Sequence, residues 1–411
     1  MTDVTTVPFA EMTAELRALI AYEFNGALDV ADPQALAARI RETTPVVRWE
    51  MGVGFFRMED VLAAGRNPAL VASEPITKQV FGMGAEDLLI PLHLDGDAHR
   101  HFRHLLDPLF TPKKMADLVP SIRTLADELI DRFVADGHVE LHEAFCVPLP
   151  STVFLTLFGL PLADMDLLIG FKDRILKNGA PTMEESERIG RVAGQEMRLH
   201  LHQRLDERKT SGRRPNDLLD AFIHLEVDGE ALSDDNIVNI MHLFTIAGLD
   251  TVTSSMSCIF AWLAQHPAER AALVADPSGL ARAIEELMRF ESPVPSGSPR
   301  WAIDDTEVNG VPVNKGDMVY LCWLAANGDP SAFTEPIMVD FDRSPNRHIA
   351  FASGLHRCLG SHLARIELRV AVEQFHRRIP EYFLAEGRSI EYQCAGVRQA
   401  RRLPLSFTAA R

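Results

Sequence analysis

The amino-acid sequence predicts a mainly α-helical protein with small β-sheets. Apolar residues recur with helical periodicity through most of the 411 residues, and amphipathic segments dominate from about Asp97 to Phe290. Runs rich in β-prone residues are short and confined to a few places. No Gly/Ser linker, low-complexity run or repeat of about 20–50 residues divides the chain. We therefore expect a single domain, residues 1–411, with a helix-rich body and a small β subdomain near the N-terminus and over 300–325.

The composition indicates a cytoplasmic protein and disfavours two kinds of partner. Lysine and arginine total 41 against 58 aspartates and glutamates, a formal net charge of −17, which opposes broad binding to nucleic acid or anionic membranes. Local basic patches are left open. The five cysteines include no CxxC pair, so neither a disulfide framework nor a zinc ribbon is indicated. Because no secretory signal and no run of ~18 apolar residues stands out, we expect no membrane anchor.

The β-prone runs come with turn signals. Val46–Trp49 and Val53–Arg57 flank Gly52 and predict a short hairpin, and Asn309-Gly310 within EVNGVPVNKGDMVYL is a strong signal for a second one. The stretch from Ile390 to Phe407 predicts a further small β element.

One long helix is predicted in the middle of the chain. Ser233 can cap it and Pro267 ends it, and its roughly 33 residues would span about 50 Å. Its middle is apolar nearly all round, as in a buried helix. Gly248, Asp250 and Thr251 nevertheless lie at its centre, where helix propensity and burial both disfavour them. We therefore expect these three residues to serve function.

A long irregular segment, Phe333 to Gly354, leads into FASGLHRCLGSHLARIELRVAVEQF. Ordered loops of this length are uncommon and usually functional. Cys358 lies between Gly354 and Gly360, just before a predicted amphipathic helix whose N-terminus favours a thiolate. The residues alone leave two interpretations open: a buried structural cysteine, or an axial thiolate ligand for a metal or a haem.

The segment resembles the haem-ligand signature of the cytochromes P450. The matching residues are Phe351, Gly354, His356, Cys358 and Gly360. In the order and spacing of that family, upstream matches are Glu286–Arg289 (its ExxR helix), Ala247–Thr251 (its oxygen-activating motif), Ala325–Pro330, Pro345–His348, and His99 with Arg103 (its propionate-binding helix). The resemblance covers nearly the whole chain, whose length is similar to that of soluble bacterial P450s of the camphor-hydroxylase type.

The resemblance implies a single-domain cytochrome P450 fold, with haem b between the long central helix and the cysteine loop. Cys358 would be the axial ligand of the iron, with Phe351 packed beside it and Gly354 and Gly360 shaping the loop. Two positions depart from the family pattern. Ala352 replaces the usual second glycine, where one methyl group should be tolerated but would tune the loop. Gly328 stands where arginine is common, and we expect only a lost surface or loop contact there.

The resemblance also assigns roles to two motifs that have ordinary alternatives. Glu286 and Arg289 are an i,i+3 pair, which is most often a solvated salt bridge, but in the family they are buried and structural. Asp250 and Thr251 would be catalytic, with Thr251 donating a hydrogen bond to dioxygen and Asp250 relaying protons. The alternative for both is ordinary helix polarity. Leu243, Ala247 and Thr251 form one stripe with Gly248 beside it, where local widening would make room for dioxygen.

Without the resemblance, we would interpret the histidines and arginines around 99–104 as the solvent-exposed face of a helix. By resemblance, His99 and Arg103 would bind the haem propionates together with Arg300 and His356. Arg100 would lie nearer the outer surface and meet an acidic iron–sulfur protein, because encounter is steered by the local field.

The substrate site implied by the resemblance is predominantly apolar. The expected lining residues are Val80, Phe81, Met83, Leu89, Leu243, Ala247, Val294, Pro295 and Val397. We expect a monomeric haem-thiolate monooxygenase that uses O2 to hydroxylate a hydrophobic small molecule such as a terpenoid, lipid or steroid. NAD(P)H would supply electrons through a reductase and a ferredoxin. The alternative is a non-catalytic haem protein that senses a gas or ligand, against which Asp250 and Thr251 argue.

Overall fold

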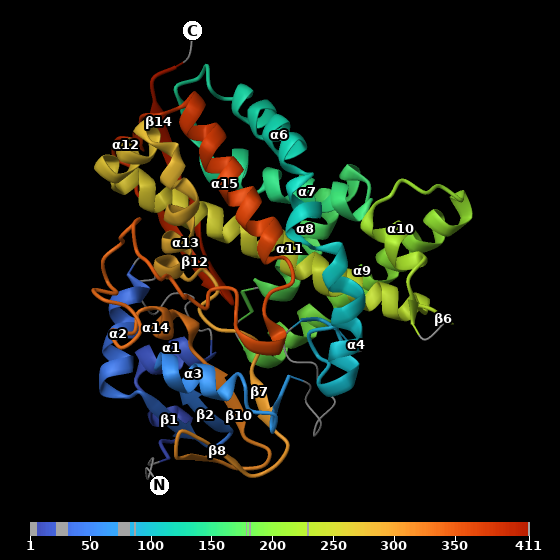
Figure 1. Cartoon of the computed structure of the whole chain (residues 1–411), viewed down its shortest axis with the longest axis vertical. Helices are drawn as coiled ribbons and strands as arrows, with labels where there is room; N and C mark the ends of the chain where they lie inside the picture. The colour runs from blue at the N-terminus through green and yellow to red at the C-terminus, as the bar shows by residue number, and fades with distance from the viewer. Residues whose placement is uncertain are drawn as a thin grey trace. The chain divides into compact units, whose positions relative to one another are not determined.

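The computed structural model describes residues 6–21, 32–72, 83–85, 88–177, 179–180, 182–227 and 230–409. These residues fall into two compact units. Their helices and strands are labelled in Figure 1. Unit 1 comprises Met1–Val71, Met115–Val147 and Thr251–Arg411, and unit 2 comprises Ala72–Lys114 and Pro148–Asp250. Each is mainly helical and its sheets are small, as the sequence predicts.

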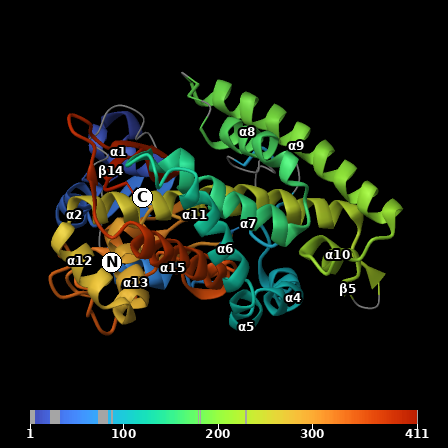
Figure 2. The same ribbon diagram turned by 90° about the horizontal axis from the view of Figure 1, so that it is seen from above.

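Unit 1 combines helices with most of the strands. Its helices include α1 (Ala14–Ala21), α2 (Pro33–Thr43), α3 (Met58–Ala64), α6 (Val119–Asp131), α12 (Pro267–Ala275), α13 (Leu280–Glu291), α14 (Trp323–Asn327) and α15 (Ser361–Arg378). Helices α6 and α15 lie side by side (Figure 2). The Asp32 side chain accepts a hydrogen bond from the Ala35 amide at 3.1 Å and thereby caps α2, while Pro33 occupies its first turn.

The largest sheet of unit 1 has the strand order β1-β2-β10-β7-β3. Its strands are β1 (Val46–Trp49), β2 (Gly52–Phe55), β3 (Leu70–Val71), β7 (Arg300–Ala302) and β10 (Met318–Leu321). The first hairpin is β1–β2, and the second is β8 (Thr306–Val308) with β9 (Val311–Val313), as predicted. Asn309 and Gly310 both have positive φ, 48° and 81°, which a tight hairpin turn requires.

The remaining strands of unit 1 confirm the predicted C-terminal β element. They are β4 (His138–Glu140), β11 (Tyr382–Leu384), β12 (Glu391–Ala395), β13 (Val397–Arg402) and β14 (Pro404–Phe407). β14 pairs with both β11 and β4, and β12 pairs with β13. Phe145, Phe260, Phe375 and Tyr382 form the aromatic part of the core, with edge or tilted ring contacts 4.9–6.4 Å apart.

Unit 2 is almost entirely helical. Its helices include α4 (Gly96–Leu106), α7 (Pro148–Phe158), α8 (Met165–Leu176), α9 (Met183–Ser211) and α10 (Leu218–Ile223), and β5 (Glu226–Val227) pairs with β6 (Glu230–Ala231). α8 and α9 lie side by side (Figure 2). α9 begins where Thr182 Oγ1 accepts from the Glu185 amide at 3.2 Å, and it ends at Gly212, whose φ is +60°.

The long helix predicted between Ser233 and Pro267 is α11 (Asp234–Gln265), and it runs through the division between the two units. The Asn236 amide donates to Ser233 Oγ at 3.2 Å, so Ser233 is the cap. Among the described residues α11 is the one helix long and apolar enough to cross a membrane, but 78% of its apolar window is buried inside the protein. That burial is typical of a core helix.

Candidate functional site

The middle of α11 is buried except along one narrow face. Between Ile237 and Ala264, only Phe244, Ala247, Gly248 and Thr251 are less than fully buried, and Ala247 is exposed. Their spacing of i, i+3, i+4 and i+7 places all four on the same side of the helix. We call these four residues the open stripe. The sequence predicted three of them, but it placed Leu243 where the structure has Phe244, and Leu243 is buried.

Gly248 is required by close packing. A Cβ atom at this position would lie 2.6 Å from Cδ2 of Phe154 on α7, inside van der Waals contact. Phe154 in turn stacks on Phe158, and Phe158 contacts Phe244. The helix keeps α geometry over its full length, so the local widening expected at Gly248 is not seen. In the structure this glycine admits an aromatic ring to the helix.

Asp250 is held by two lysines that the sequence did not point to. Its side chain is 1% exposed, and Oδ1 accepts hydrogen bonds from Lys172 Nζ at 2.9 Å and from Lys177 Nζ. Burial alone raises the pKa of Asp250, but the ammonium groups of Lys177 and Lys172 outweigh it and hold the pKa below its ordinary value. Asp250 is therefore an ionised, buried carboxylate directly preceding Thr251.

A polar connection leads from this carboxylate toward solvent. Lys172 Nζ also lies 2.7 Å from Oδ1 of Asp173, whose side chain is 36% exposed, whereas the side chain of Lys172 is 6% exposed. Asp173, Lys172 and Asp250 thus form a continuous series of ionisable groups within unit 2. No local sequence pattern could have predicted it, because Lys172 and Asp250 are 78 residues apart.

The Cys358 loop folds back on itself through the backbone. The Cys358 amide donates to the Phe351 carbonyl at 2.9 Å, and the Ala352 amide donates to the Ile349 carbonyl at 2.8 Å. Gly354 has a φ of +73°, and a Cβ there would lie 3.0 Å from the Gly65 carbonyl oxygen, so both conformation and space require glycine. Gly360 caps α15, which begins at Ser361.

Cys358 differs from the other cysteines in its exposure. It is exposed, while Cys146, Cys258, Cys322 and Cys394 are buried. Leu355, three residues earlier in the same loop, is 61% exposed. A thiol and an apolar side chain presented together by a constrained loop suit a flat, apolar ligand with a soft metal, because thiolates bind iron and apolar surface favours contact over water. This donor set fits a haem.

Phe351 is fixed by a half-buried cluster of charges. The Arg365 guanidinium lies 4.3 Å from its ring centroid, and Arg365 binds Glu285 through Nε at 2.6 Å and Nη2 at 2.9 Å. His348 Nε2 lies 3.0 Å from the same carboxylate. Burial by itself would raise the pKa of Glu285, but His348 and Arg365 lower it to about 2. Sequence reasoning missed Glu285 and Arg365, although each adjoins a motif that it used.

Glu286 and Arg289 form a buried centre for the long irregular loop. Both side chains are 1% exposed, and the guanidinium Nε and Nη2 donate to the carboxylate at 2.8 and 2.7 Å. Arg289 Nη1 also donates to the Asn327 and Pro336 carbonyls, each at 2.8 Å. The Arg343 guanidinium and the Asn346 amide reach Glu286 at 3.0 Å. These bonds satisfy a loop that has no helix or strand of its own from Gly328 to Ser353.

The predicted propionate ligands come from both units. In unit 2, His99 and Arg103 lie one turn apart on α4, where His99 is 2% exposed and Arg103 Nε lies 2.9 Å from Asp107 Oδ1. In unit 1, Arg300 lies on β7 opposite Val319 of β10, and His356 follows the Ala352–Gly354 turn. Both are half-buried. The role of these four residues remains a prediction.

The predicted substrate residues are only partly located. Val80 and Phe81 lie outside the described residues. In unit 2, Leu89 is fully buried, and the Met83 carbonyl accepts a hydrogen bond from His242 Nε2 of α11 at 2.9 Å. In unit 1, the Arg398 amide donates to the Pro293 carbonyl at 2.7 Å, which joins the strand that contains Val397 to the segment that contains Val294 and Pro295. The role of these residues in binding substrate remains a prediction.

Metal binding by side chains alone is not indicated. Within the described ranges no three His, Cys, Asp or Glu residues are grouped as they would be around a metal ion. His200 and His202 instead contact Asp164 at 3.0 Å and Asp235 at 3.5 Å.

Comparison with known proteins agrees with these features. A model of the family "Cytochrome P450" matches residues 165–276 and 280–378. The chain is 30% identical over 398 residues to the cytochrome P450 monooxygenase PikC of Streptomyces venezuelae, covering 93% of this chain and 92% of that protein. It is 31% identical over 373 residues to the steroid C26-monooxygenase of Mycolicibacterium smegmatis, covering 90% and 91%. A solved structure of the bacillaene polyketide synthase cytochrome P450 PksS from Bacillus subtilis 168 superposes with a TM-score of 0.83 at 28% identity, covering 92% of this chain and 97% of that chain.

Proposed function

The chain belongs to the cytochrome P450 family, and from this premise we propose that it hydroxylates a bulky, largely apolar small molecule with O2 and electrons from a ferredoxin. It is a P450 monooxygenase, an oxidoreductase like the relatives it matches. The single observation that carries the proposal is the open stripe, because the helix between Ile237 and Ala264 is uncovered only there, and three of the four stripe residues are those expected to face oxygen and substrate. A haem protein that only senses a gas or a ligand does not need an open helix face together with a buried carboxylate and a hydroxyl group.

Haem b is the cofactor that the donor set of the Cys358 loop would hold. When bound, a thiolate-ligated haem supplies the redox centre at which the O–O bond is cleaved. Cys358 would ligate the iron, and the Phe351 ring, held by Arg365, would shield the sulfur from water. His99, Arg103, Arg300 and His356 would neutralise the two propionates. NAD(P)H is the proposed source of electrons, and we place the protein in the cytoplasm as a monomer.

Proton supply is the task we assign to the polar series in unit 2. Asp250 is ionised and bridged to Lys172, so a proton can pass from solvent through Asp173 and Lys172 without a bare charge crossing apolar core. The Thr251 hydroxyl, next along α11, would order the last hydrogen bond beside the substrate. Asp250 and Thr251 are therefore the proposed catalytic residues.

The proposed substrate is apolar because the surroundings of the open stripe are apolar. Phe244 contacts the rings of Phe110, Phe158 and Phe222 at 5.5–6.4 Å. Relatives of this chain include a protein named for steroid C26 oxidation and one named for polyketide biosynthesis, which supports a terpenoid, steroid or lipid framework. A screen of such compounds against the ferric haem spectrum, followed by product analysis with surrogate ferredoxin and reductase, tests this directly.

Ligation is tested by replacing Cys358. We expect Cys358→His to retain some haem but to lose the reduced carbon-monoxide spectrum of thiolate ligation and nearly all hydroxylation, because imidazole cannot donate charge as a thiolate does. Cys146→Ser is the matched control, since Cys146 is buried in the same unit and lies on a different segment, His142–Cys146. An unchanged spectrum in Cys358→His would overturn the assignment.

A further inference from the structure

Position 328 is glycine in this chain, although it is commonly arginine in the family, and the structure explains why glycine fits. Gly328 has φ −100° and ψ 12°, a conformation open to any residue. The restriction is spatial. A Cβ at Gly328 would lie 3.2 Å from Nη1 of Arg41, so the guanidinium of Arg41 already occupies the space into which a side chain at 328 would grow. The expected loss of a surface or loop contact at this position remains a prediction.

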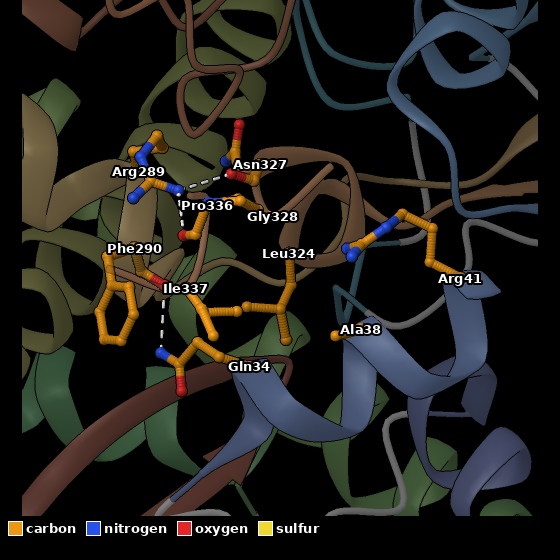
Figure 3. A pocket seen from close by; sticks show the side chains of 10 residues that line it. All are labelled: Gln34, Ala38, Arg41, Arg289, Phe290, Leu324, Asn327, Gly328, Pro336 and Ile337. Carbon is orange, nitrogen blue, oxygen red and sulfur yellow. Dashed lines mark hydrogen bonds between the residues drawn. The ribbon is translucent and has the colours of Figure 1, made fainter. Parts of the chain in front are cut away.

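Arg41 reaches this position from α2, far away in the sequence. Its side chain points from α2 toward Leu324 and Gly328 across a small pocket (Figure 3). Arg41 is 5% exposed, and its Nη1 donates to the Ala325 carbonyl at 2.8 Å, 284 residues away. The residues that line the pocket include Arg41, Leu324, Asn327 and Gly328. Burying a guanidinium is unfavourable unless it makes such bonds, so this placement is specific.

The carbonyl that Arg41 binds belongs to the last turn of α14. The Ala325 carbonyl also accepts from the Gly328 amide at 3.2 Å, and a cation is favourable beside it because the final carbonyls of a helix carry partial negative charge. Asp329, which is 4% exposed, adds the largest favourable charge acting on Arg41. Asp329 also accepts a hydrogen bond from the Met58 amide at 2.8 Å. Arg41 thus ties α2 to the end of α14 and to the turn that follows it.

The end of α14 in turn holds the segment that leads to Cys358. Asn327, the last residue of α14, is fully buried, and its Oδ1 accepts from the Ile349 amide at 2.8 Å. The Ile349 carbonyl accepts from the Ala352 amide at 2.8 Å, and the Phe351 carbonyl accepts from the Cys358 amide at 2.9 Å. A displacement of Asn327 would therefore be passed through hydrogen bonds to the cysteine loop.

We propose that Arg41 is a positioning residue for the Cys358 loop, supplying from α2 the guanidinium that the chain lacks at position 328. It acts through Ala325 and Asn327 and touches no reacting group. This inference rests on the proposed ligation of haem by Cys358. It predicts that arginine at 41 and arginine at 328 are alternatives. With either one alone, the end of α14 binds a guanidinium; with no arginine at either position it loses that bond; and with both, two cations compete for one space.

The test is a double-mutant cycle on the haem-loaded protein with Arg41→Met, Gly328→Arg and the combined variant. The readout is the fraction of reduced protein with the carbon-monoxide spectrum of thiolate ligation, followed along a urea series. We expect each single change to lower the midpoint for loss of that spectrum by about 0.5 M urea, from the lost or opposed charged hydrogen bond. The combined variant should recover most of that loss. Arg39→Met is the control, because Arg39 lies on the same helix with its side chain 58% exposed.

The outcomes separate clearly. Recovery in the combined variant supports the proposal, whereas losses that add, or no loss in Arg41→Met, overturn it. If Arg41→Met does not yield folded protein, Arg41→Lys replaces it in the same double-mutant cycle, since lysine keeps the charge but lacks the planar guanidinium group. Absence of the thiolate spectrum in the wild type would instead contradict ligation by Cys358. A normal wild-type spectrum without recovery contradicts only the role of Arg41.

Discussion

Ala352 has a left-handed backbone, with a φ of +58°, six residues before Cys358. A non-glycine residue is disfavoured there because its Cβ approaches the following carbonyl oxygen. The family pattern of glycine at this position thus has a conformational reason, and this chain carries the strain instead. The hydrogen bond from the Ala352 amide to the Ile349 carbonyl at 2.8 Å holds the turn in place.

Replacing Ala352 with glycine should therefore stabilise the protein. We expect Ala352→Gly to raise the free energy of unfolding by about 1 kcal/mol, because relief of the left-handed strain exceeds the added freedom of the unfolded chain. Urea unfolding measures it. Ala271→Gly, at an exposed site inside α12, is the opposite control and should destabilise by about 1 kcal/mol. A loss of stability in Ala352→Gly would show that the methyl group contributes packing that outweighs the strain.

The proposed role of Thr251 depends on a single atom, its hydroxyl oxygen. Thr251→Ala removes the hydroxyl from the open stripe but keeps a residue of high helix propensity. We expect near-normal substrate binding and NADH use, with product per NADH lowered about tenfold or more as electrons are diverted to hydrogen peroxide. Thr251→Ser should stay largely coupled.

The control for Thr251 is on the same helix. Thr253 is 3% exposed and lies off the open stripe, so Thr253→Ala should leave coupling unchanged. Equal product per NADH in the wild type and in the alanine and serine variants at 251 would mean that this hydroxyl serves only helix packing.

At the scale of elements, unit 2 joins the described segment Met83–Ala85 to two helices. Gly84 packs against α9 so closely that a Cβ on Gly194 would lie 1.7 Å from the Gly84 carbonyl oxygen. His242 of α11 holds the preceding carbonyl, that of Met83, and is itself 2% exposed. Backbone-to-backbone contact of this kind needs glycine on both sides. Close packing therefore fixes the segment against α9, and a single hydrogen bond joins it to α11.

Burial of His242 should make unit 2 sensitive to acid. Burial, with a smaller contribution from Arg198, lowers the pKa of His242 to about 4, although the hydrogen bond to the Met83 carbonyl opposes the shift. Because the unfolded chain binds the proton at higher pH than the folded one, the stability is present above pH 6.5 and is lost as pH falls toward 4. We expect the wild type to lose about 2 kcal/mol more than His242→Gln between pH 7 and pH 5.

Unfolding in urea at the two pH values measures this difference. Glutamine can still donate to the Met83 carbonyl, so the substitution removes the titration and keeps the bond. His104→Gln, an exposed site on α4, should follow the wild type. Equal pH dependence of the wild type and His242→Gln would show that His242 does not control the acid response.

At the scale of the whole molecule, the net charge of −17 contrasts with exposed positive side chains on one part of unit 2. Arg100 of α4 is 59% exposed and pairs with Asp97, and Lys113 and Lys114 of α5 (Pro112–Ala116) are exposed. An acidic ferredoxin would be attracted to these cations and repelled by most of the remaining surface. Encounter rates depend on such local fields more than on total charge.

Charge reversal at Arg100 should slow electron transfer from the ferredoxin. We expect Arg100→Glu to lower the rate of ferredoxin-dependent reduction about tenfold at low salt, with a smaller defect at high salt and unchanged substrate affinity. Arg188→Glu makes the same change in net charge at an exposed arginine on α9, also paired within its helix. Stopped-flow measurement of the reduction rate of both variants distinguishes a local effect at Arg100 from an effect of net charge. Equal slowing would indicate a response to net charge alone.

Much of the architecture follows from local sequence signals. Ser233 and Pro267 bound α11 within two residues, and Asn309-Gly310 places its hairpin, because caps and turns depend on neighbours in the chain. The pairing of Asp250 with Lys172 and of Gly328 with Arg41 could not be predicted, since those contacts join distant segments without a local pattern. Phe244 could have been found, because it continues the spacing of Ala247 and Thr251. The motif residues were predictable, but their supporting partners were not.

The contrast between one exposed and four buried cysteines has a practical consequence. Alkylating reagents attack thiolates, and burial raises the pKa of Cys258 to about 12 and of Cys322 to about 11, while that of Cys146 is raised well above its ordinary value. Cys394 is 2% exposed. A molecule without iron at Cys358 would take up one equivalent of iodoacetamide, and a ligated one would take up none. Mass spectrometry after brief alkylation would therefore measure the fraction of protein molecules in a preparation whose Cys358 ligates iron.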